Sequence, residues 1–332
     1  VLTNNGNVYS WGWDKSGRLG HGDTNSCNAP KQIETLGPGA GNAIATVGGG
    51  SRHVCAITVD GRVLVWGGNG NGQLGLGHNN DTMSPTLVNV GNASFNALSR
   101  GCFAFSTAII STNIEARLVV AAGAGAGAGA LGGSLSNSGR MLRVCGKNDC
   151  GELGLGDKRD RNTFTEVTAS GPLRAVVYGW KHMLILIHDG IVHATGNNTE
   201  GQLGLGNNNS CTTLALVQGG LTGKTVVKIA CGQYFSGALT ADGDLYLWGY
   251  NDCGQLGDGS TTDRNTPTLV TGGNLGGAVI DFAVGECHCI AVTRDHRVLT
   301  WGSGGYGKLG LGNMNDESTP TEVTALRGCS IA

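Results

Sequence analysis

Residues 226–270 read VVKIACGQYFSGALTADGDLYLWGYNDCGQLGDGSTTDRNTPTLV, and this stretch decides the fold. Glycine-containing turns such as Asp242-Gly243 interrupt it. Between the turns lie four short apolar runs, at residues 226–230, 235–240, 245–248 and 268–270. Because short apolar runs joined by such turns are typical of antiparallel strands, the stretch predicts a four-stranded meander.

The glycine loop of this stretch recurs along the chain. Copies of the form G-x-L-G begin at Gly17, Gly72, Gly151, Gly201, Gly254 and Gly307, and Trp-Gly strand ends precede four of them at Trp11, Trp66, Trp248 and Trp301. Self-similarity with a period of roughly 50 residues indicates an array of repeating units. The 60 glycines disfavour helices. A repeated four-stranded unit therefore predicts an all-β fold, a β-propeller whose blades are the repeats.

Six repeats are counted, in a single domain over residues 1–332. We expect them at residues 1–36, 44–90, 94–168, 173–218, 225–271 and 278–324. The end of the chain, CSIA at 329–332, resembles a first strand, and Val1 to Thr3 resembles the end of a second strand. We therefore expect residues 328–332 to complete the repeat at 1–36, so that the two termini close the ring and remove exposed strand edges.

The third repeat contains an insertion at residues 112–138, which includes AAGAGAGAGALGG. The alignment of the repeats places it between the second and third strands. Glycine and alanine side chains offer little to offset the entropy of ordering, so we expect a disordered loop. The alternative is an arm that folds on contact with a partner.

Composition excludes several classes of protein. The net charge is -2 and only 14% of residues are charged, so no basic stripe is available for nucleic acid, and direct nucleic-acid binding is not expected. No run of about 20 strongly apolar residues predicts a membrane span. The 11 cysteines lack the density of a disulfide scaffold, which favours an intracellular, reducing compartment. The absence of methionine at Val1 suggests a fragment or a processed chain.

The stretch at 230–257 resembles the repeat of the RCC1 (regulator of chromosome condensation) family. A G-x-x-H-type turn, an Asp-Gly turn, a Trp-Gly strand end and a G-x-L-G loop follow one another at fixed offsets, and the likeness extends over nearly the whole chain. It implies an RCC1-type β-propeller, for which seven blades are typical, whereas six repeats are counted here. It also implies that G-x-L-G is a backbone turn and not a nucleotide-binding loop.

Strand parity predicts which turns share a face. In a four-stranded meander the first and third turns lie on one side, and the second turn and the link to the next blade lie on the other. Exposed aromatic and basic residues are the usual anchors of an interface. The candidate partner-binding face therefore contains Trp13, Arg52, Trp180, Lys181, Tyr234, Tyr250, Glu286 and Tyr306. The alternative is that these residues only cap the mouth of the channel.

Signals for catalysis, a cofactor or a metal are weak. His53, His182 and His288 occupy one repeat position, so we expect a structural hydrogen bond in several blades. No nucleophile or base accompanies them at a recognisable spacing. Cys150 and Cys253 lie in different blades, and Cys287-x-Cys289 supplies two ligands where structural zinc needs four. No catalytic, cofactor-binding or metal-ligating residue is therefore assigned.

The resemblance implies a non-enzymatic protein-interaction module or scaffold, part of a larger protein or multi-subunit assembly. One alternative is a guanine-nucleotide exchange factor for a small GTPase. The exchange branch that acts on Ran has an acidic residue before the histidine of a G-x-x-H turn, where this chain has Arg52, Lys181 and Cys287, so Ran is not the expected partner. A second alternative is the substrate-binding part of a ubiquitin ligase. The ultraviolet-B receptor branch has a cluster of tryptophans in repeated turns. Only one turn of this chain, GWKHM at 179–183, resembles those turns, so photoreception is not expected.

Overall fold

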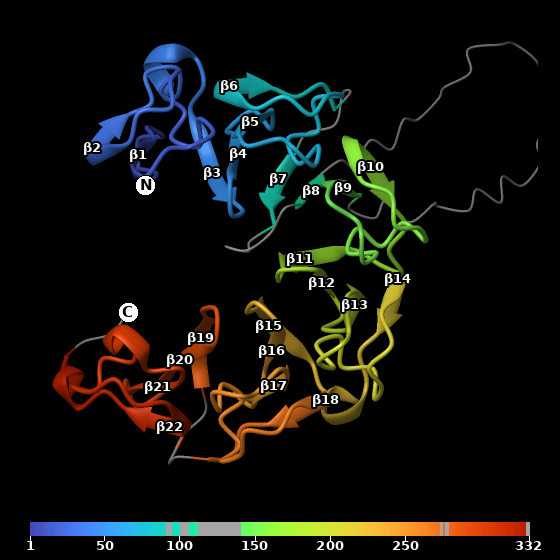
Figure 1. Ribbon diagram of the computed structural model, residues 1–332, viewed down its shortest axis with the longest axis vertical. Helices are drawn as coiled ribbons and strands as arrows, with labels where there is room; N and C mark the ends of the chain where they lie inside the picture. The colour runs from blue at the N-terminus through green and yellow to red at the C-terminus, as the bar shows by residue number, and fades with distance from the viewer. Residues whose placement is uncertain (91–94, 100–105, 112–140, 273–274, 276–278, 330–332) are drawn as a thin grey trace, which may run out of the picture.

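The computed structural model describes residues 1–90, 95–99, 106–111, 141–272, 275 and 279–329, and these form a β-propeller. Five four-stranded antiparallel sheets and one two-stranded sheet are arranged around a central axis, each sheet forming one blade (Figure 1). The expected all-β fold of four-stranded blades is confirmed. Within the described residues the helices are four short 3-10 turns, at Pro38–Ala40, Gly219–Leu221, Gly305–Gly307 and Thr324–Leu326, and none is long or apolar enough to cross a membrane.

The blades follow one another in chain order. Blade 1 contains β1 (Tyr9–Gly12) and β2 (Cys27–Gln32). Blade 2 contains β3 (Ile44–Gly49), β4 (His53–Thr58), β5 (Val63–Gly67) and β6 (Thr82–Leu87). Blade 3 contains β7 (Phe95–Leu98), β8 (Ser106–Ser111), β9 (Leu142–Gly146) and β10 (Arg161–Val167). Each four-stranded blade is a simple meander in which every strand pairs with its neighbours in sequence.

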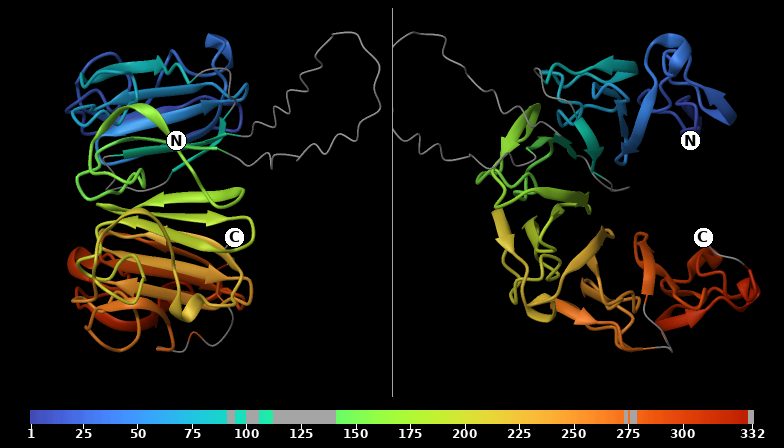
Figure 2. Two further views of the ribbon diagram at one scale, coloured as in Figure 1. Left: turned by 90° about the vertical axis from the view of Figure 1, so that its right-hand side faces the viewer. Right: turned by 180° about the vertical axis from the view of Figure 1, so that it is seen from behind.

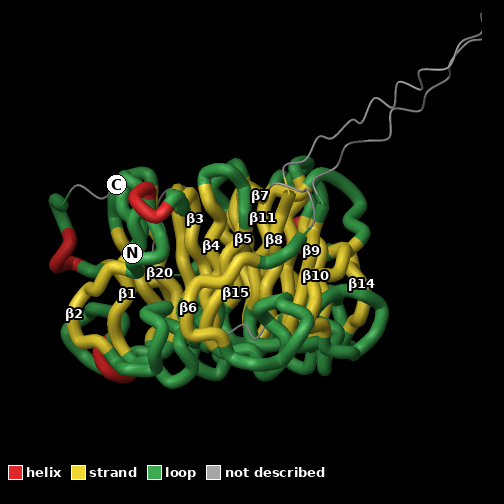
Figure 3. Tube along the Cα trace, turned by 90° about the horizontal axis from the view of Figure 1, so that it is seen from above, coloured by secondary structure: helices red, strands yellow, loops and turns green. Residues whose placement is uncertain are grey.

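The second half of the chain repeats this arrangement. Blade 4 contains β11 (Leu173–Tyr178), β12 (His182–Ile187), β13 (Val192–Gly196) and β14 (Cys211–Leu216). Blade 5 contains β15 (Val226–Cys231), β16 (Phe235–Thr240), β17 (Leu245–Gly249) and β18 (Arg264–Leu269). Blade 6 contains β19 (Val279–Val284), β20 (His288–Thr293), β21 (Val298–Gly302) and β22 (Glu317–Glu322). The strands run between two layers of loops, so the molecule has two loop faces (Figures 2 and 3).

Within the described residues, blade 1 has two strands where the other blades have four. Leu2 forms an antiparallel bridge with Val8, and the Tyr9 amide donates to the Val1 carbonyl at 2.8 Å, so the start of the chain does lie where the end of a second strand is expected. Both termini lie at the open side between blades 1 and 6 (Figure 1). Residues 330–332 lie outside the described residues, and ring closure by the termini therefore stays a prediction.

The core lies between adjacent blades rather than within one blade. One buried cluster, for example, joins Leu184 and Val192 of blade 4 to Val226 and Trp248 of blade 5. Burial of such apolar side chains contributes about 1.5 to 3 kcal/mol each. The propeller is therefore held together by the same contact made at successive junctions.

A tryptophan of one blade fits into the G-x-L-G loop of the blade before it. The indole N–H of Trp301 donates to the Gln255 carbonyl at 3.0 Å, and the ring is fully buried. Gly257 makes room for it: a Cβ there would approach the indole nitrogen to 2.7 Å, and its φ of +67° disfavours any other residue. Trp66 and Trp248 make the same bond to Arg18 and Gln202. The repeated Trp-Gly and G-x-L-G motifs are thus two halves of one junction.

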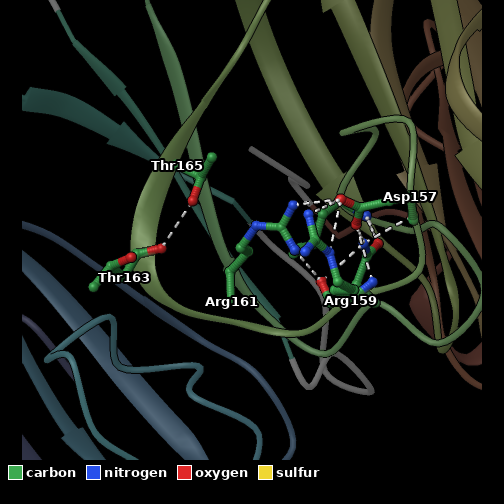
Figure 4. A network of polar contacts seen from close by, with 7 residues as sticks. Asp157, Arg159, Arg161, Thr163 and Thr165 are labelled. Atoms are coloured by element: carbon green, nitrogen blue, oxygen red, sulfur yellow. Dashed lines mark hydrogen bonds and ion pairs between the residues drawn. The ribbon is translucent and has the colours of Figure 1, made fainter.

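Polar side chains fix the long loop that leads to the fourth strand. The Asp157 carboxylate accepts a bond from the Arg161 guanidinium at 2.7 Å and also contacts Arg159 (Figure 4). The bond from Arg161, followed by the amide of Arg159, holds the pKa of Asp157 well below its usual range. This pair ties the end of the loop to the first residue of β10.

The predicted insertion at residues 112–138 lies outside the described residues. The strands on either side of it are described, and Ile110 of β8 pairs with Leu142 of β9. Since β8 and β9 are the second and third strands of blade 3, the insertion connects these two strands, as the repeat alignment predicts.

Candidate partner-binding face

The turns between first and second strands come together on one loop face. The Trp180 amide of the β11–β12 turn donates to the Gln233 carbonyl of the β15–β16 turn at 3.1 Å. The Gln233 amide in turn donates to the Glu286 carbonyl of the β19–β20 turn at 3.2 Å. A chain of backbone hydrogen bonds therefore joins the turns of blades 4, 5 and 6 into one continuous surface.

Three aromatic rings lie on this surface. Trp180 and Tyr234 meet edge to face with their centroids 5.1 Å apart and their planes at 89°. Tyr250, from the loop after β17, meets Tyr234 at 6.1 Å and 68°. All three side chains are half-buried, so their positions are fixed while part of each ring stays accessible. Together with Lys181 these residues are called the aromatic rim.

Lys181 completes the aromatic rim through two contacts. Its ammonium lies 5.1 Å from the centroid of the Trp180 ring and 3.2 Å from a carboxylate oxygen of Asp149 in blade 3. Burial acts to lower the pKa of Lys181, but the hydrogen bond to Asp149 and the charges of neighbouring groups together outweigh burial, so the pKa is raised overall. Lys147 also lies 3.2 Å from Asp149. Asp149 therefore holds two lysines in place, one of them on the rim.

Acidic side chains border the rim on the side of blades 4, 5 and 6. The Tyr250 hydroxyl donates to Asp252 at 2.8 Å, and this bond, followed by burial, raises the pKa of Tyr250. Burial raises the pKa of Tyr234, and the charges of Glu200 and Glu286 also act on its phenol. Although these acids come from different blades, the structure gathers them around the two tyrosines. Glu200, Asp252 and Glu286 are called the acidic border.

The other candidate residues lie apart from the rim. Trp13 is 65% exposed and stacks beneath the Arg18 guanidinium, which lies 4.8 Å from the ring centroid. Arg18 also donates to the Ser51 carbonyl, next to the exposed Arg52 of blade 2. Tyr306 of blade 6 is 99% exposed. The structure therefore brings Trp180, Lys181, Tyr234, Tyr250 and Glu286 together, whereas Trp13 and Arg52 form a second group.

Two of the repeated histidines make the expected structural hydrogen bond. The Thr107 hydroxyl donates to the Gln73 carbonyl at 2.7 Å and lies 2.8 Å from Nε2 of His53. Since the hydroxyl hydrogen is used in the bond to the carbonyl, the hydroxyl oxygen accepts from His53, and the imidazole donates through Nε2–H. His182 makes the same contact with Ser236 at 3.0 Å. Burial lowers the pKa of His53 to about 4 and of His182 to about 3, so both are neutral at pH 7.

Glu152 departs from the repeat pattern in the loop of blade 3. Three of the other copies have a glutamine at this position, Gln73, Gln202 and Gln255, and these three side chains and Glu152 are all buried, whereas blades 1 and 6 have Arg18 and Lys308. Glu152 accepts a hydrogen bond from the Cys150 amide at 2.9 Å, as the glutamines do from the equivalent amides. Burial raises the pKa of Glu152 to about 7. The carboxyl group therefore titrates near neutral pH beneath the face that carries Lys181.

The side chains of Asp149, Cys150 and Glu152 are close enough to be considered as metal ligands, since their ligand atoms lie within 4.8 Å of one another. Their contacts do not suit a metal ion. Asp149 is engaged by two lysines, and burial raises the pKa of the Cys150 thiol, which keeps it from becoming a thiolate ligand. We therefore propose no metal at this cluster.

The sequence prediction missed a repeated asparagine that fixes the loop in four of the blades. The Asn251 side-chain oxygen accepts the Leu256 amide at 2.8 Å, and its NH₂ donates to the carbonyls of Ser260 and Thr262. Asn69, Asn148 and Asn198 do the same in their own blades. Asp14 fills this position in blade 1, where it is buried and accepts the Arg18 amide. The spacing N-x-x-G, whose glycine begins the G-x-L-G loop in these four blades, is the signal that identifies the asparagines, whereas blade 6 has Gly304 at this position.

The sheets and their repeated turns define a β-propeller made from one kind of sequence repeat. The chain belongs to the RCC1 repeat family. The pattern described as "Regulator of chromosome condensation (RCC1) repeat" matches residues 5–57, 60–102, 189–239, 242–292 and 295–332. The resemblance predicted from the motifs is therefore confirmed.

Curated relatives include proteins with different roles. The ultraviolet-B receptor UVR8 of Arabidopsis thaliana is 33% identical over 321 residues, which cover 96% of this chain and 66% of the receptor. The human E3 ubiquitin-protein ligase HERC2 is 31% identical over 336 residues, which cover the whole of this chain and 6% of the ligase. The chain thus spans just under two thirds of one relative and a small part of the other.

Solved structures show the same fold. The crystal structure of Prp20p from Saccharomyces cerevisiae has a TM-score of 0.76 at 20% identity, over 98% of this chain and 74% of that one. The crystal structure of human WBSCR16 has a TM-score of 0.74 at 21% identity, over 98% and 80% of the two chains. At this level of identity, both similarities show a shared fold and nothing further.

Proposed function

We propose that this chain is a non-enzymatic protein-interaction module or scaffold whose partner binds to the aromatic rim. The observation that carries this proposal is the packing of Trp180, Tyr234 and Tyr250 across two blades. Half-buried aromatic rings held by their neighbours lose little conformational entropy on binding, which makes them effective anchors. Lys181, held by Asp149, adds a fixed charge at the edge of the same surface.

The relatives are consistent with this role without defining the partner. Prp20p is a propeller of the same fold whose crystal structure was reported together with its binding to Gsp1p and histones. The described residues of this chain contain ten cysteines, none of them in a disulfide. We therefore propose a reducing compartment, in which a protein partner or a multi-subunit assembly is bound through the rim. We propose no cofactor and no direct contact with nucleic acid.

The first alternative is guanine-nucleotide exchange on a small GTPase other than Ran. The observation that favours it is the acidic border, since an exchange factor of this fold is expected to carry an acidic cluster on one loop face. A GDP-release assay against purified small GTPases tests it, with faster release expected if the alternative holds. The second alternative is the substrate-binding part of a ubiquitin ligase, favoured by the likeness of the whole chain to 6% of HERC2. Capture of a protein that becomes ubiquitinated in the presence of the full-length protein tests it.

The experiment that tests the main proposal is gentle isolation of the native protein from its source. Size-exclusion chromatography and mass spectrometry then identify what elutes with it. Stable recovery with other proteins in stoichiometric amounts is the expected result. Recovery as a free chain at every salt concentration contradicts the scaffold proposal, and recovery with a small GTPase that nucleotide releases favours the exchange alternative.

A further inference from the structure

We propose that the partner presents a basic segment to the aromatic rim, and that an arginine of this segment stacks on Tyr234 and Tyr250 between the carboxylates of the acidic border. The inference rests on the proposed function, because it names the chemistry of the partner that the same surface binds. Four features of the described residues carry it: the aromatic geometry, the charge around the tyrosines, the engagement of the nearest lysine, and a similar contact elsewhere on this face.

The first feature is the geometry of the rings. Tyr234 lies between Trp180 and Tyr250, and both neighbours meet it at steep interplanar angles of 89° and 68°. Cations are attracted to the faces of aromatic rings when they lie within about 6 Å of the centroid. Lys181 already makes such a contact with Trp180. Within the described part of the chain no cation lies over Tyr234 or Tyr250.

The second feature is the charge around the two tyrosines. Asp252 accepts the Tyr250 hydroxyl, and Glu200 and Glu286 act on the Tyr234 phenol. A further acid, Asp263, is half-buried beside them, and burial followed by the charges of Glu200 and Asp252 raises its pKa. Carboxylates that repel one another are stabilised when a cation is placed between them. The surface is therefore complementary to positive charge and unfavourable for phosphate.

The third feature is that the lysine beside Tyr234 already forms an ion pair on the side away from the acidic border. Lys181 is the basic group whose charge acts on Tyr234, and it is paired with Asp149 at 3.2 Å on the side of blade 3. A second base, Lys308 of blade 6, lies near Glu286, since both charges act on His288, but its ammonium bonds to the Ser303 hydroxyl at 3.3 Å. No ion pair within the described residues joins Lys181 or Lys308 to the acidic border. A partner cation can add to this surface without displacing an existing ion pair.

The fourth feature is an arginine stack within the chain itself. On the same loop face, the Arg18 guanidinium lies 4.8 Å from the centroid of the exposed Trp13 ring. A guanidinium is planar, is weakly hydrated and can bind a carboxylate with two parallel hydrogen bonds while it stacks, whereas an ammonium cannot. The tyrosines and the acidic border provide both kinds of contact at once, so arginine fits better than lysine.

The test uses synthetic peptides as probes of the surface. Four peptides of equal length carry alternating glycine with arginine, lysine, glutamine or glutamate, and isothermal titration calorimetry measures binding to the full chain at low and physiological salt. The arginine peptide should bind more tightly than the lysine peptide, and the other two should not bind. Equal binding of the arginine and lysine peptides, or none by the arginine peptide at low salt, overturns the proposal.

Variants of the protein separate a specific surface from general attraction to acidic groups. The variant Glu200→Gln, Asp252→Asn, Glu286→Gln should weaken arginine-peptide binding about tenfold, since close charge pairs are lost while side-chain shape is kept. The control Glu34→Gln, Glu166→Gln, Asp189→Asn removes the same charge from exposed positions elsewhere and should change binding less than about twofold. Equal loss in both variants overturns the proposal.

The same variants distinguish this inference from the proposed function. If Trp180→Ala, Lys181→Ala, Tyr234→Ala abolishes binding of the native partner and neutralising the acidic border does not, the interaction surface stands and the basic-segment inference falls. If neither variant affects the native partner, the proposed surface itself is wrong. A concentration-dependent dimer that is lost on neutralisation identifies a second copy as the occupant and overturns the inference of a separate basic partner.

Discussion

Trp180 and Tyr234 come from different blades, yet their rings meet at 89° with centroids 5.1 Å apart. The contact depends on the backbone bond from Trp180 to Gln233, which joins the two turns. The junctions of the propeller are rigid because a buried core lies between the blades. The surface proposed to bind a partner is therefore positioned by the same packing that builds the fold.

The junction between blades predicts that alanine substitution at two equivalent glycines lowers stability by different amounts. Gly257 and Gly310 have φ of +67° and +69°, so alanine at either position carries a left-handed penalty of about 1 to 2 kcal/mol. Only at Gly257 would the new Cβ meet an indole, that of Trp301 at 2.7 Å, and overpacking there adds about 1 to 3 kcal/mol. Thermal melting should show a clearly lower Tm for Gly257→Ala than for Gly310→Ala. Equal melting temperatures would show that the indole contact does not stabilise the junction.

Buried neutral histidines predict a loss of stability in acid. The folded-state pKa of His53 and His182 lies below the ordinary value of 6.5, so their contribution is complete above pH 6.5 and declines as the pH falls below it. Each histidine should lower the free energy of unfolding by about 2 kcal/mol as the pH falls from 6.5 to 5. The variant His182→Gln keeps an N–H donor toward Ser236 and should flatten the pH dependence of the free energy of unfolding. An unchanged slope would contradict the assignment of His182 as neutral and buried.

Glu152 predicts the opposite pH dependence. Its folded-state pKa of about 7 lies above the ordinary value of 4.5, so the folded state binds the proton more tightly and stability declines as the pH rises from about 4.5 through 7. Glu152→Gln introduces the residue found in three of the other loops and should raise the Tm at pH 8 by about 2 °C or more, with a smaller effect at pH 5. An equal effect at both pH values would mean that the carboxyl group does not titrate in this range.

Removal of residues 112–138 should leave the propeller folded. Ser111 would then be connected to Gly139 by a direct peptide bond, close to the start of β9, and the pair Ile110 with Leu142 would be closed by a short turn. We expect a melting temperature within about 2 °C of that of the full chain, because the deletion leaves a short hairpin turn between two strands whose pairing is kept. A variant that fails to fold would show that the insertion contributes to blade 3.

Much of the fold could be predicted from the sequence because the repeat makes its signals redundant. Trp-Gly and G-x-L-G recur in order, and each copy constrains the others, so the four-stranded blade followed from the copy at 226–270. Ring closure could not be settled in this way. It depends on how residues 328–332 lie against blade 1, and a few terminal residues carry too little pattern to place.

The candidate surface was predicted in part. Parity placed Trp180, Tyr234 and Tyr250 on one face, but their edge-to-face packing depends on the distance between neighbouring blades, which sequence does not give. The acids Glu200, Asp252 and Glu286 are far apart in sequence, and they gather only because blades 4, 5 and 6 are adjacent. Trp13 and Arg52 share the face but not the cluster, since they belong to blades 1 and 2.

The most direct test of the central claim is the affinity of the co-purified partner for three forms of the chain. Trp180→Ala, Lys181→Ala, Tyr234→Ala removes most of the aromatic rim. The control Val59→Ala, Ile191→Ala, Asp242→Ala alters three exposed residues on the opposite loop face. If the rim binds the partner, the first variant should lose at least about 100-fold in affinity, as removal of interface anchors does. Its melting temperature and the affinity of the control should stay unchanged. Equal affinity of all three forms would contradict the claim that this surface is the binding site.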